Sequence, residues 1–291
     1  MSEADLLKRI RRLAGPRVPG LVRGIGDDCA IVHQPGARDD LLITTDFLIE
    51  DVHFRASTHP AEAVGHKALA RGLSDIAAMG GAPRYCLLSL ALPAAAARHW
   101  IDRFYRGLLR LAGRTGTALI GGDLARADRV ICDIVVIGAV PAGTALRRDT
   151  ARPDDGIYVS GQLGRPWKSH LRPEPRLALG RFLRTRLRAS AAMDLTDSLA
   201  LDLHRLCLES GVSAALDREP PRWRGASADA ALHGGEDYEL LFTMRPGARV
   251  PAEHDGMTLT RIGTIRRGRA GVVEYLGAAL EPRGWDHFTN S

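Results

Sequence analysis

The chain has 291 residues, of which 45% are hydrophobic and 25% charged, and its formal net charge is +6. This length predicts about two domains, and the composition is that of an ordinary globular protein with no apolar run long enough to cross a bilayer. The positive charge comes mainly from scattered arginines that are not interleaved with aromatic residues, so we expect neither a nucleic-acid partner nor a membrane partner.

The N-terminal residues 1–15 have neither the apolar core nor the small-residue cleavage pattern of a signal peptide, and they predict an amphipathic helix. Cys29, Cys86, Cys132 and Cys207 lie far apart and form no C-x-x-C pair. This spacing predicts buried thiols rather than a zinc site or a disulfide framework. We therefore expect a cytoplasmic protein.

Apolar, β-branched runs alternate with helical patterns in the first half of the chain, which is typical of mixed α and β layers. The predicted elements are a strand at 40–46, a helix at 59–81, a strand at 84–93, a helix at about 94–114, and strands at 117–123 and 129–140. Pro60 at the start of the first helix and Gly80 just past its end fit the usual asymmetry of helix termini.

A stretch rich in turn formers and charge, residues 141–156, predicts a domain boundary near residue 145. The sequence thus divides into an N-terminal domain, 1–145, and a C-terminal α/β domain, 146–291. In the second domain we expect a strand at 156–161, helices at about 174–188 and 197–211, and strands near 238–244, 257–266 and 271–275.

Carboxylates in the first half fall where α/β proteins build sites. Asp46 and Asp123 each close an apolar strand, and the stretch "RGIGDDCAIV" places Asp27 and Asp28 directly after a glycine turn. Asp75 lies near a helix C-terminus, where the helix dipole disfavours a negative charge. Each of these residues alone is more simply explained as structural.

The second half repeats the pattern. "MDLTDSL" places Asp194 and Asp197 around Thr196, and "HGGEDYELLF" follows two glycines with Glu236 and Asp237. Two carboxylates about 4 Å apart repel by roughly 4 kcal/mol at an effective dielectric near 20, so convergence of these acids would require protonation or cations. Mg²⁺ is suited to a few carboxylates together with phosphate oxygens.

Eight blocks in this order carry a resemblance to a known family: "GIGDDCAIV", "ITTDFLIEDVHF", "HKALARGLSDIAAMGGAP", "LIGGD", "ALRRD", "DLTDSL", "GGEDYELLF" and "GWDHF". The chain resembles the thiamine-monophosphate kinases over nearly its whole length. These belong to the superfamily of aminoimidazole ribonucleotide synthetase, selenophosphate synthetase and the hydrogenase maturation dehydratase. The resemblance implies a two-domain α/β fold and a homodimer in which the N-terminal sheet joins that of a partner subunit in a barrel.

The resemblance also implies ATP-dependent phosphorylation of thiamine monophosphate to the diphosphate, by direct in-line transfer with several Mg²⁺ ions and without a phosphoenzyme. The implied metal ligands are Asp28, Thr44, Thr45, Asp46, Asp75, Asp123, Asp194 and Asp197. The implied ATP contacts are Gly122, Asp123, Arg148 and Thr196, and the implied substrate contacts are His53, Glu236 and Trp285. Since the acceptor phosphate is ionised near neutrality, we assign no catalytic base.

The chain departs from the family pattern in two places. After "GIYVSGQLG" a helix resembling "GDSAAGL" is replaced by "RPWKSHLRPEPRLALG", so we expect that helix to be shortened or lost. Ser198 stands where the family has glycine, and it would be strained if the backbone there required a positive φ.

Other functions stay open at this point. The same acids would suit a nucleotide-binding relative without catalysis, a metal-dependent phosphohydrolase, or a sister synthetase acting on an aminoimidazole precursor. The last is disfavoured because "GGEDYEL" and "GWDHF" match the kinases better. A Walker-type kinase is excluded by the lack of a G-x-x-x-x-G-K-[ST] motif.

Overall fold

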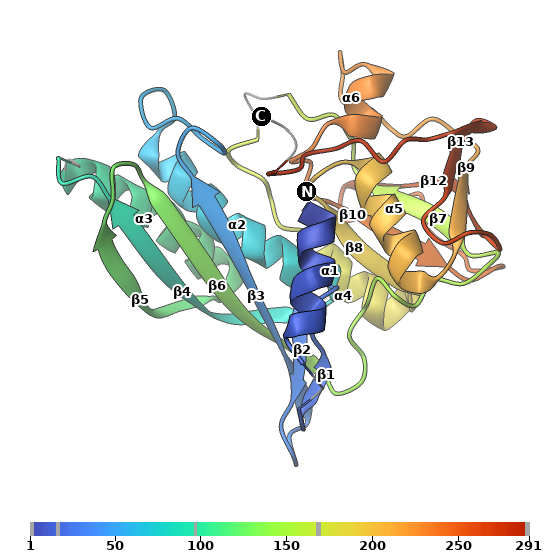
Figure 1. The fold of residues 1–291 in the computed structure, drawn as a ribbon, viewed down its shortest axis with the longest axis horizontal. Helices are drawn as coiled ribbons and strands as arrows, with labels where there is room; N and C mark the ends of the chain where they lie inside the picture. The colour runs from blue at the N-terminus through green and yellow to red at the C-terminus, as the bar shows by residue number, and fades with distance from the viewer. Residues whose placement is uncertain (1–2, 16–17, 96–97, 167–169, 289–291) are drawn as a thin grey trace.

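Two β-sheets, each with helices packed against it, make up the described part of the chain (Figure 1). The computed structural model describes residues 3–15, 18–95, 98–166 and 170–288. Helix α1 (Glu3–Leu13) precedes both sheets, as the N-terminal amphipathic pattern predicts, and an ion pair from Arg11 to Glu209 ties it to the C-terminal half.

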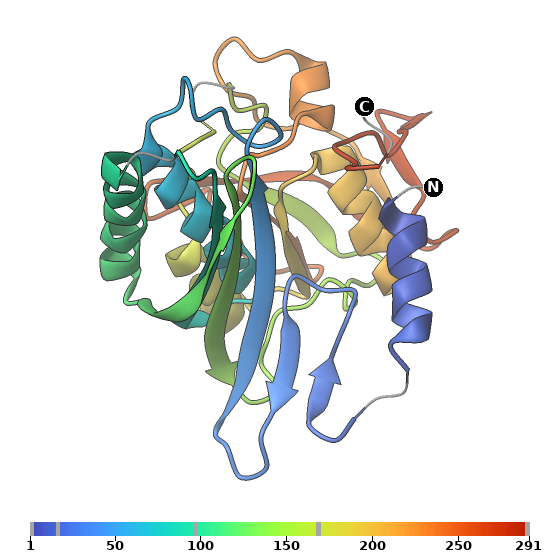
Figure 2. The ribbon, with the colours of Figure 1, turned by 60° about the vertical axis from the view of Figure 1, so that its left-hand side comes forward.

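The first sheet has the strand order β1-β2-β3-β6-β4-β5, and Figure 2 shows β1 and β2 continuing it beside β3. Neighbouring strands are antiparallel except β4 and β5, which are parallel. The strands are β1 (Leu21–Arg23), β2 (Ala30–His33), β3 (Asp39–Ile49), β4 (Ala82–Leu92), β5 (Ala118–Arg126) and β6 (Ile131–Pro141).

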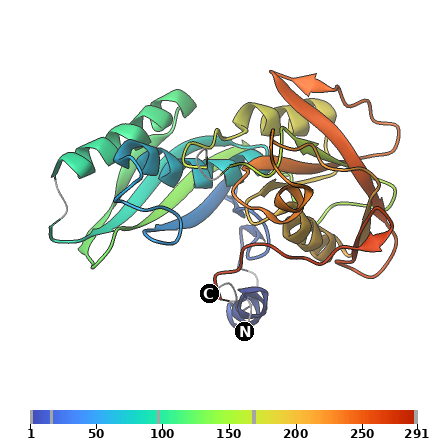
Figure 3. The same ribbon diagram turned by 90° about the horizontal axis from the view of Figure 1, so that it is seen from above.

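Helices α2 (Ala61–Ala78) and α3 (Arg98–Thr115) lie together on one side of this sheet (Figure 3). Leu42, Leu48 and Ile134 point to that side and are buried in the core with α2. Among the helices of the described residues, none is both long and apolar enough to cross a membrane.

The opposite side of the first sheet carries apolar side chains without being buried. Phe47 is 58% exposed and Tyr85 is 45% exposed, although their strand neighbours Leu48 and Cys86 are fully buried. We define this side as the outer face; its side chains include Ile43, Thr45, Phe47, Tyr85, Ser89, Asp133, Val135 and Ile137. A sheet that is apolar on both sides is typical of one that is covered on both.

The second sheet has the order β14-β13-β9-β12-β7-β10-β8, with β11 paired to β12. Its strands are β7 (Gly156–Ser160), β8 (Ala191–Leu195), β9 (Ser213–Leu216), β10 (Glu239–Met244), β11 (Glu253–His254), β12 (Met257–Arg266), β13 (Val273–Tyr275) and β14 (Ala278–Ala279). Its helices are α4 (Leu177–Phe182), continued by a π-helical turn η2 (Leu183–Leu187), α5 (Leu199–Ser210) and α6 (Ala228–His233).

The α/β fold class predicted from the sequence is confirmed, with a strand or helix at each predicted place. The four cysteines are buried free thiols, as predicted. The boundary near residue 145 lies between β6 and β7 and stays a prediction. The sequence does not predict short elements without a clear pattern, such as β1, β9 and α6.

The two departures from the family pattern have different outcomes. Residues 161–166 and 170–176 contain no helix, in agreement with the expected loss, while 167–169 lie outside the described residues. Ser198 has φ 171°, which is ordinary extended backbone, so the strain considered for this position does not arise. Its hydroxyl instead caps α5 by accepting from the Leu201 N–H, and donates to the carbonyl of Arg283.

Candidate functional site

A cavity of about 560 Å³ lies between the two sheets and is lined by residues from both halves of the chain. Most of the residues that the sequence singled out line it. They are Asp28, Thr44, Thr45, Asp46, His53, Asp75, Arg148, Asp194, Thr196, Asp197, Glu236 and Trp285. Carboxylates dispersed over more than 200 positions of sequence therefore converge, as the sequence interpretation requires.

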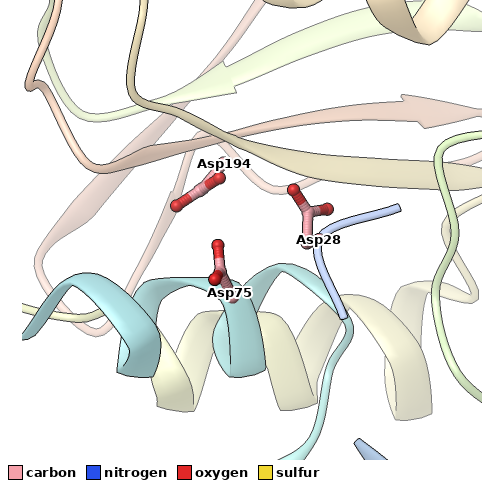
Figure 4. A group of neighbouring side chains, drawn as sticks. All are labelled: Asp28, Asp75 and Asp194. Atoms are coloured by element: carbon pink, nitrogen blue, oxygen red, sulfur yellow. The ribbon is translucent and has the colours of Figure 1, made fainter. Parts of the chain in front are cut away.

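Three carboxylates form the centre of this convergence. Asp28 precedes β2, Asp75 lies on α2 and Asp194 on β8, and one oxygen of each lies within 4.8 Å of the others. Figure 4 shows the three side chains directed toward one another. Burial raises the pKa of all three above the ordinary range. Repulsion from neighbouring carboxylates raises the pKa of Asp75 and Asp194 further, whereas attraction to Arg148 partly offsets the effect of burial on Asp28.

The surroundings of these acids supply few positive charges. Thr44 donates a hydroxyl hydrogen bond of 2.5 Å to Asp75, Ser74 donates one of 2.5 Å to Asp194, and Arg148 forms an ion pair with Asp28. Oδ2 of Asp28 is buried and has no hydrogen-bond partner in the part of the chain that is described. A set of buried oxygen donors with excess negative charge fits a hard divalent cation such as Mg²⁺.

The two adjacent aspartates of the glycine turn have different surroundings. Asp27 faces two arginines, with Nε of Arg23 at 3.5 Å and Nε of Arg148 at 3.7 Å. Burial and the repulsion from Asp28 nevertheless raise its pKa to about 7. Arg148 thus faces both aspartates of the turn, and of the two only Asp28 belongs to the acid cluster.

Strand β3 sends its polar side chains to opposite sides. Asp46 points to the side of α2, where Nη2 of Arg71 donates to its Oδ1 at 2.5 Å. The hydroxyl of Thr45 belongs to the outer face and donates to Asp133 Oδ1 at 2.5 Å. Because side chains alternate along a strand, Thr44 and Asp46 share one side of the sheet, and Thr45 reaches the cavity only at its rim.

The "DLTDSL" segment forms a turn that α5 stabilises. The buried carboxylate of Asp202 accepts the backbone N–H groups of Thr196, Asp197 and Ser198 at 3.1–3.2 Å. Arg205 forms an ion pair with the side chain of Asp197. The backbone of the turn is thus held by Asp202 and one of its side chains by Arg205. Burial, with repulsion from Asp197, raises the pKa of Asp202 to about 7.

The "GGED" segment packs directly on this turn. A Cβ atom at Gly235 would lie 2.7 Å from the carbonyl oxygen of Thr196, so only glycine allows this approach. Glu236 follows in the left-handed region, φ 64°, and its N–H donates to the same carbonyl at 2.7 Å. The two motifs therefore present Thr196 and Glu236 to one cavity.

The carboxylate of Glu236 meets a fully buried lysine. Lys67 Nζ of α2 donates to Oε1 at 2.6 Å and to the carbonyl of His53 at 3.2 Å, and His170 Nδ1 lies 2.5 Å from Oε2. Burial alone would raise the pKa of Glu236, but His170 and Lys67 lower it to about 2. Burial lowers the pKa of Lys67 to about 8, against the attraction of Glu236.

Aromatic rings line the same end of the cavity. His53 packs against His287 with ring centroids 5.3 Å apart, and Trp285 meets His287 edge-on at 5.7 Å. Burial, followed by repulsion from Arg71 and Lys67, lowers the pKa of His53 to about 3. Since its Nδ1 accepts the Ile49 N–H, the neutral ring carries its proton on Nε2.

Gly122 and Asp123 are the predicted site residues that the fold of one chain does not bring to the cavity. Both are exposed on β5, which is separated from β3 by β6 and β4. At a spacing of about 4.8 Å per strand, β5 lies roughly 14 Å from β3. Asp123 stands in register with Ser89, Asp133 and Phe47, a row that lies on the outer face.

Sequence reasoning missed the cations that face these acids. Lys67 and Arg71 precede Asp75 by eight and four residues in "HKALARGLSD", a spacing that places all three on one side of a helix. That signal was available in the sequence. No pattern could have identified His170, which reaches Glu236 from an irregular connection.

Magnesium is expected to raise the melting temperature more at pH 8 than at pH 6. The carboxylates of the cluster have raised pKa values in the folded chain, so their contribution to stability is present at low pH and is lost as the pH rises through those values. Protons therefore compete with Mg²⁺ at pH 6 and less at pH 8. We expect a gain of about 5 °C at pH 8 for an Mg²⁺ concentration near 100 times Kd. Equal gains at both pH values, by differential scanning fluorimetry against EDTA, would contradict this.

Comparison with known proteins agrees with this geometry. Residues 26–140 match the family model of the AIR synthase related protein, N-terminal domain. A solved structure at 19% identity, hydrogenase maturation protein HypE in complex with ATP, covers 91% of this chain and 90% of its own with a TM-score of 0.69, and shows the shared fold.

Proteins with higher sequence identity to this chain have a more specific name than the family model. Thiamine-monophosphate kinase of Bacillus subtilis is 32% identical, and the alignment covers 91% of this chain and 93% of the relative. AaThiL, solved in complex with AMPPCP and TMP, superposes with a TM-score of 0.86 at 30% identity, over 99% of this chain and 97% of its own. Identity at this level over almost the full length of both chains confirms the resemblance found in the motifs, and the chain belongs to the thiamine-monophosphate kinase family.

Proposed function

We propose that this chain transfers the γ-phosphoryl group of ATP to the phosphate of thiamine monophosphate, forming thiamine diphosphate and ADP. One observation carries the proposal: a cluster of buried carboxylates and an aromatic, anionic pocket open into the same cavity. The family membership adds to it, since a relative has been solved with both AMPPCP and TMP.

The lining of the cavity suits both reactants, and we call the part around Trp285, His53 and Glu236 its acceptor end. Trp285, His53 and Glu236 offer flat rings and a carboxylate to a cationic, aromatic acceptor. The same cavity contains Arg148, which offers a planar pair of donors to a phosphate, and Thr196 from the turn that packs on the "GGED" segment.

Five acids and two threonines of the lining are the proposed magnesium ligands: Asp28, Thr44, Thr45, Asp46, Asp75, Asp194 and Asp197. Bound there, Mg²⁺ would neutralise the mutual repulsion of two anionic phosphates. The chain itself positions the reacting groups. The elements β3, α2 and β8 hold the acids in place, and the "GGED" turn would hold the acceptor next to them. No side chain is needed to remove a proton, because the acceptor phosphate is already ionised, and the transfer is direct.

We also propose a homodimer joined through the outer face. The exposed apolar side chains of Phe47 and Tyr85 require a cover, and a second copy would supply the same surface. Gly122 and Asp123, which one chain leaves outside its own cavity, would then be placed to contribute across the interface. A cytoplasmic location stays a prediction of the sequence.

Turnover of purified protein tests the function. Incubation with ATP, Mg²⁺ and thiamine monophosphate is expected to form thiamine diphosphate and ADP in equal amounts, as measured by chromatography. Release of inorganic phosphate without an acceptor would indicate a phosphohydrolase instead. Binding of ATP with no turnover under any of these conditions would indicate a nucleotide-binding relative without catalysis.

Replacement of Trp285 by alanine is expected to raise KM for thiamine monophosphate about tenfold and to leave KM for ATP unchanged. The ring lines the acceptor end of the cavity and is 41% exposed, so its loss removes a stacking surface without opening the core. Steady-state kinetics with each substrate varied in turn measures both constants. A rise confined to KM for ATP would mean that Trp285 contacts ATP rather than the acceptor.

A further inference from the structure

One side of helix α2 carries three charged residues, of which Arg71 and Asp75 line the cavity and Lys67 is buried behind Glu236. Lys67, Arg71 and Asp75 are spaced four residues apart, so their side chains share one side of the helix at steps of about 6 Å. We call these three residues the α2 row.

Each member of the α2 row faces a different part of the site. Lys67 holds Glu236 at the acceptor end, whereas Asp75 belongs to the carboxylate cluster. Arg71 lies between them and pairs with Asp46. Arg71 therefore lines the cavity between the carboxylate cluster and the proposed place of the acceptor at Glu236.

The guanidinium of Arg71 is held in place but has donors left. Its side chain is 15% exposed, and Nη2 donates to Asp46 at 2.5 Å. Nη1 lies 3.5 Å from the hydroxyl of Tyr238, at the limit of a hydrogen bond. Nε is buried and makes no hydrogen bond to any described residue. A buried guanidinium with an unused N–H is suited to a planar, anionic partner such as a phosphate.

Burial alone would lower the pKa of Arg71, but attraction to Asp46 raises it well above the ordinary value. The side chain therefore keeps its charge throughout and is unsuited to moving a proton. Its chemistry is limited to binding and orienting an anion.

Resting on the proposed function, we infer that Arg71 is a catalytic residue that binds the phosphate of the acceptor at the point of transfer. In the step itself, an oxygen of the acceptor phosphate forms a bond to the γ-phosphorus of ATP. The bond from that phosphorus to the β,γ-bridging oxygen breaks, and ADP leaves with the electron pair. Arg71 gains and loses no proton, and it offsets the charge of the attacking phosphate.

Binding measurements distinguish this role from a purely structural one. Titration calorimetry in Mg²⁺ buffer compares thiamine monophosphate with thiamine, which lacks the phosphate, for the unaltered chain and for R71M and R71K. R71M is expected to weaken binding of the monophosphate at least about tenfold and that of thiamine less than twofold. R71K keeps the charge without the planar fork and is expected to lie between.

A matched variant controls for loss of an arginine as such. Arg106 of α3 pairs with Glu62 on the surface, far from any residue of the cavity lining, and R106M is expected to leave both affinities unchanged. Thermal melts of all variants verify that each is folded. If R71M fails to fold, the result for R71K tests the inference. This variant removes the planar guanidinium group but keeps the positive charge that pairs with Asp46.

The outcomes separate this inference from the proposed function. If the unaltered chain does not phosphorylate thiamine monophosphate, the proposed function falls and the inference falls with it. If the unaltered chain is active but R71M or R71K weakens both ligands equally, or neither, Arg71 acts only as a partner of Asp46 and the inference alone is overturned.

Discussion

Replacement of Asp75 by asparagine is expected to lower kcat by about 10³-fold or more at saturating ATP and Mg²⁺, because the site loses one of the three charges that converge at its centre. The amide can still accept the hydrogen bond from Thr44, so the local geometry is retained. Steady-state kinetics measures the loss.

The same substitution is expected to stabilise the chain in metal-free buffer. Asp75 is buried and is repelled by Asp194, Asp46 and Asp28, so removal of its charge relieves a cost that folding otherwise bears. We expect the melting temperature in EDTA to rise by about 2–4 °C, equivalent to about 1 kcal/mol. An exposed acid on α3, Asp102, provides the control: D102N should alter neither rate nor stability. A variant of Asp75 with wild-type kcat would contradict the assignment of the cluster.

Replacement of Phe47 by aspartate is expected to convert a dimer into a monomer and to lower activity about 100-fold. Phe47 is 58% exposed at the centre of the outer face, in register with Asp133. A carboxylate introduced there would have to be buried without a partner in an assembled sheet interface, and it would repel Asp133 and its own copy. Activity should fall with assembly, because in the proposed dimer Asp123 contributes to the cavity of the other subunit.

Light scattering coupled to size exclusion measures the oligomeric state of this variant. Leu109 is 49% exposed on α3, on the other side of the sheet, and L109D is the matched control that should leave both assembly and activity unchanged. A monomeric wild type with full activity would exclude the proposed interface. So would a dimeric F47D with unaltered kinetics.

Much of the fold could be read from the sequence because the long elements have strong periodicities. Strand β6 and helix α3 are examples, since the first alternates buried and half-buried side chains and the second buries one side, which includes Phe104, Leu108 and Leu111. Short strands such as β9 have too few residues for a period, and only their pairing with longer strands defines them.

The residue types of the site were predictable from the sequence, but their arrangement in space was not. Acids at strand ends and after glycines indicated cations, and the structure brings Asp28, Asp75 and Asp194 together. Sequence spacing carries no information on which side of a folded sheet Asp123 will lie, and that depends on strand order. The partners of Glu236 could not be read from spacing for a similar reason: Lys67 meets it only through the packing of the two halves, and His170 reaches it from an irregular connection within the second half.

The contact between Lys67 and Glu236 also limits how the molecule can move. It joins α2 of the first half to the "GGED" turn of the second, deep inside the protein, with Lys67 wholly enclosed. A hinge motion that parted the halves would break this buried ion pair, at a cost of about 3–5 kcal/mol. The pair therefore opposes domain opening as the route by which reactants enter the cavity and products leave it.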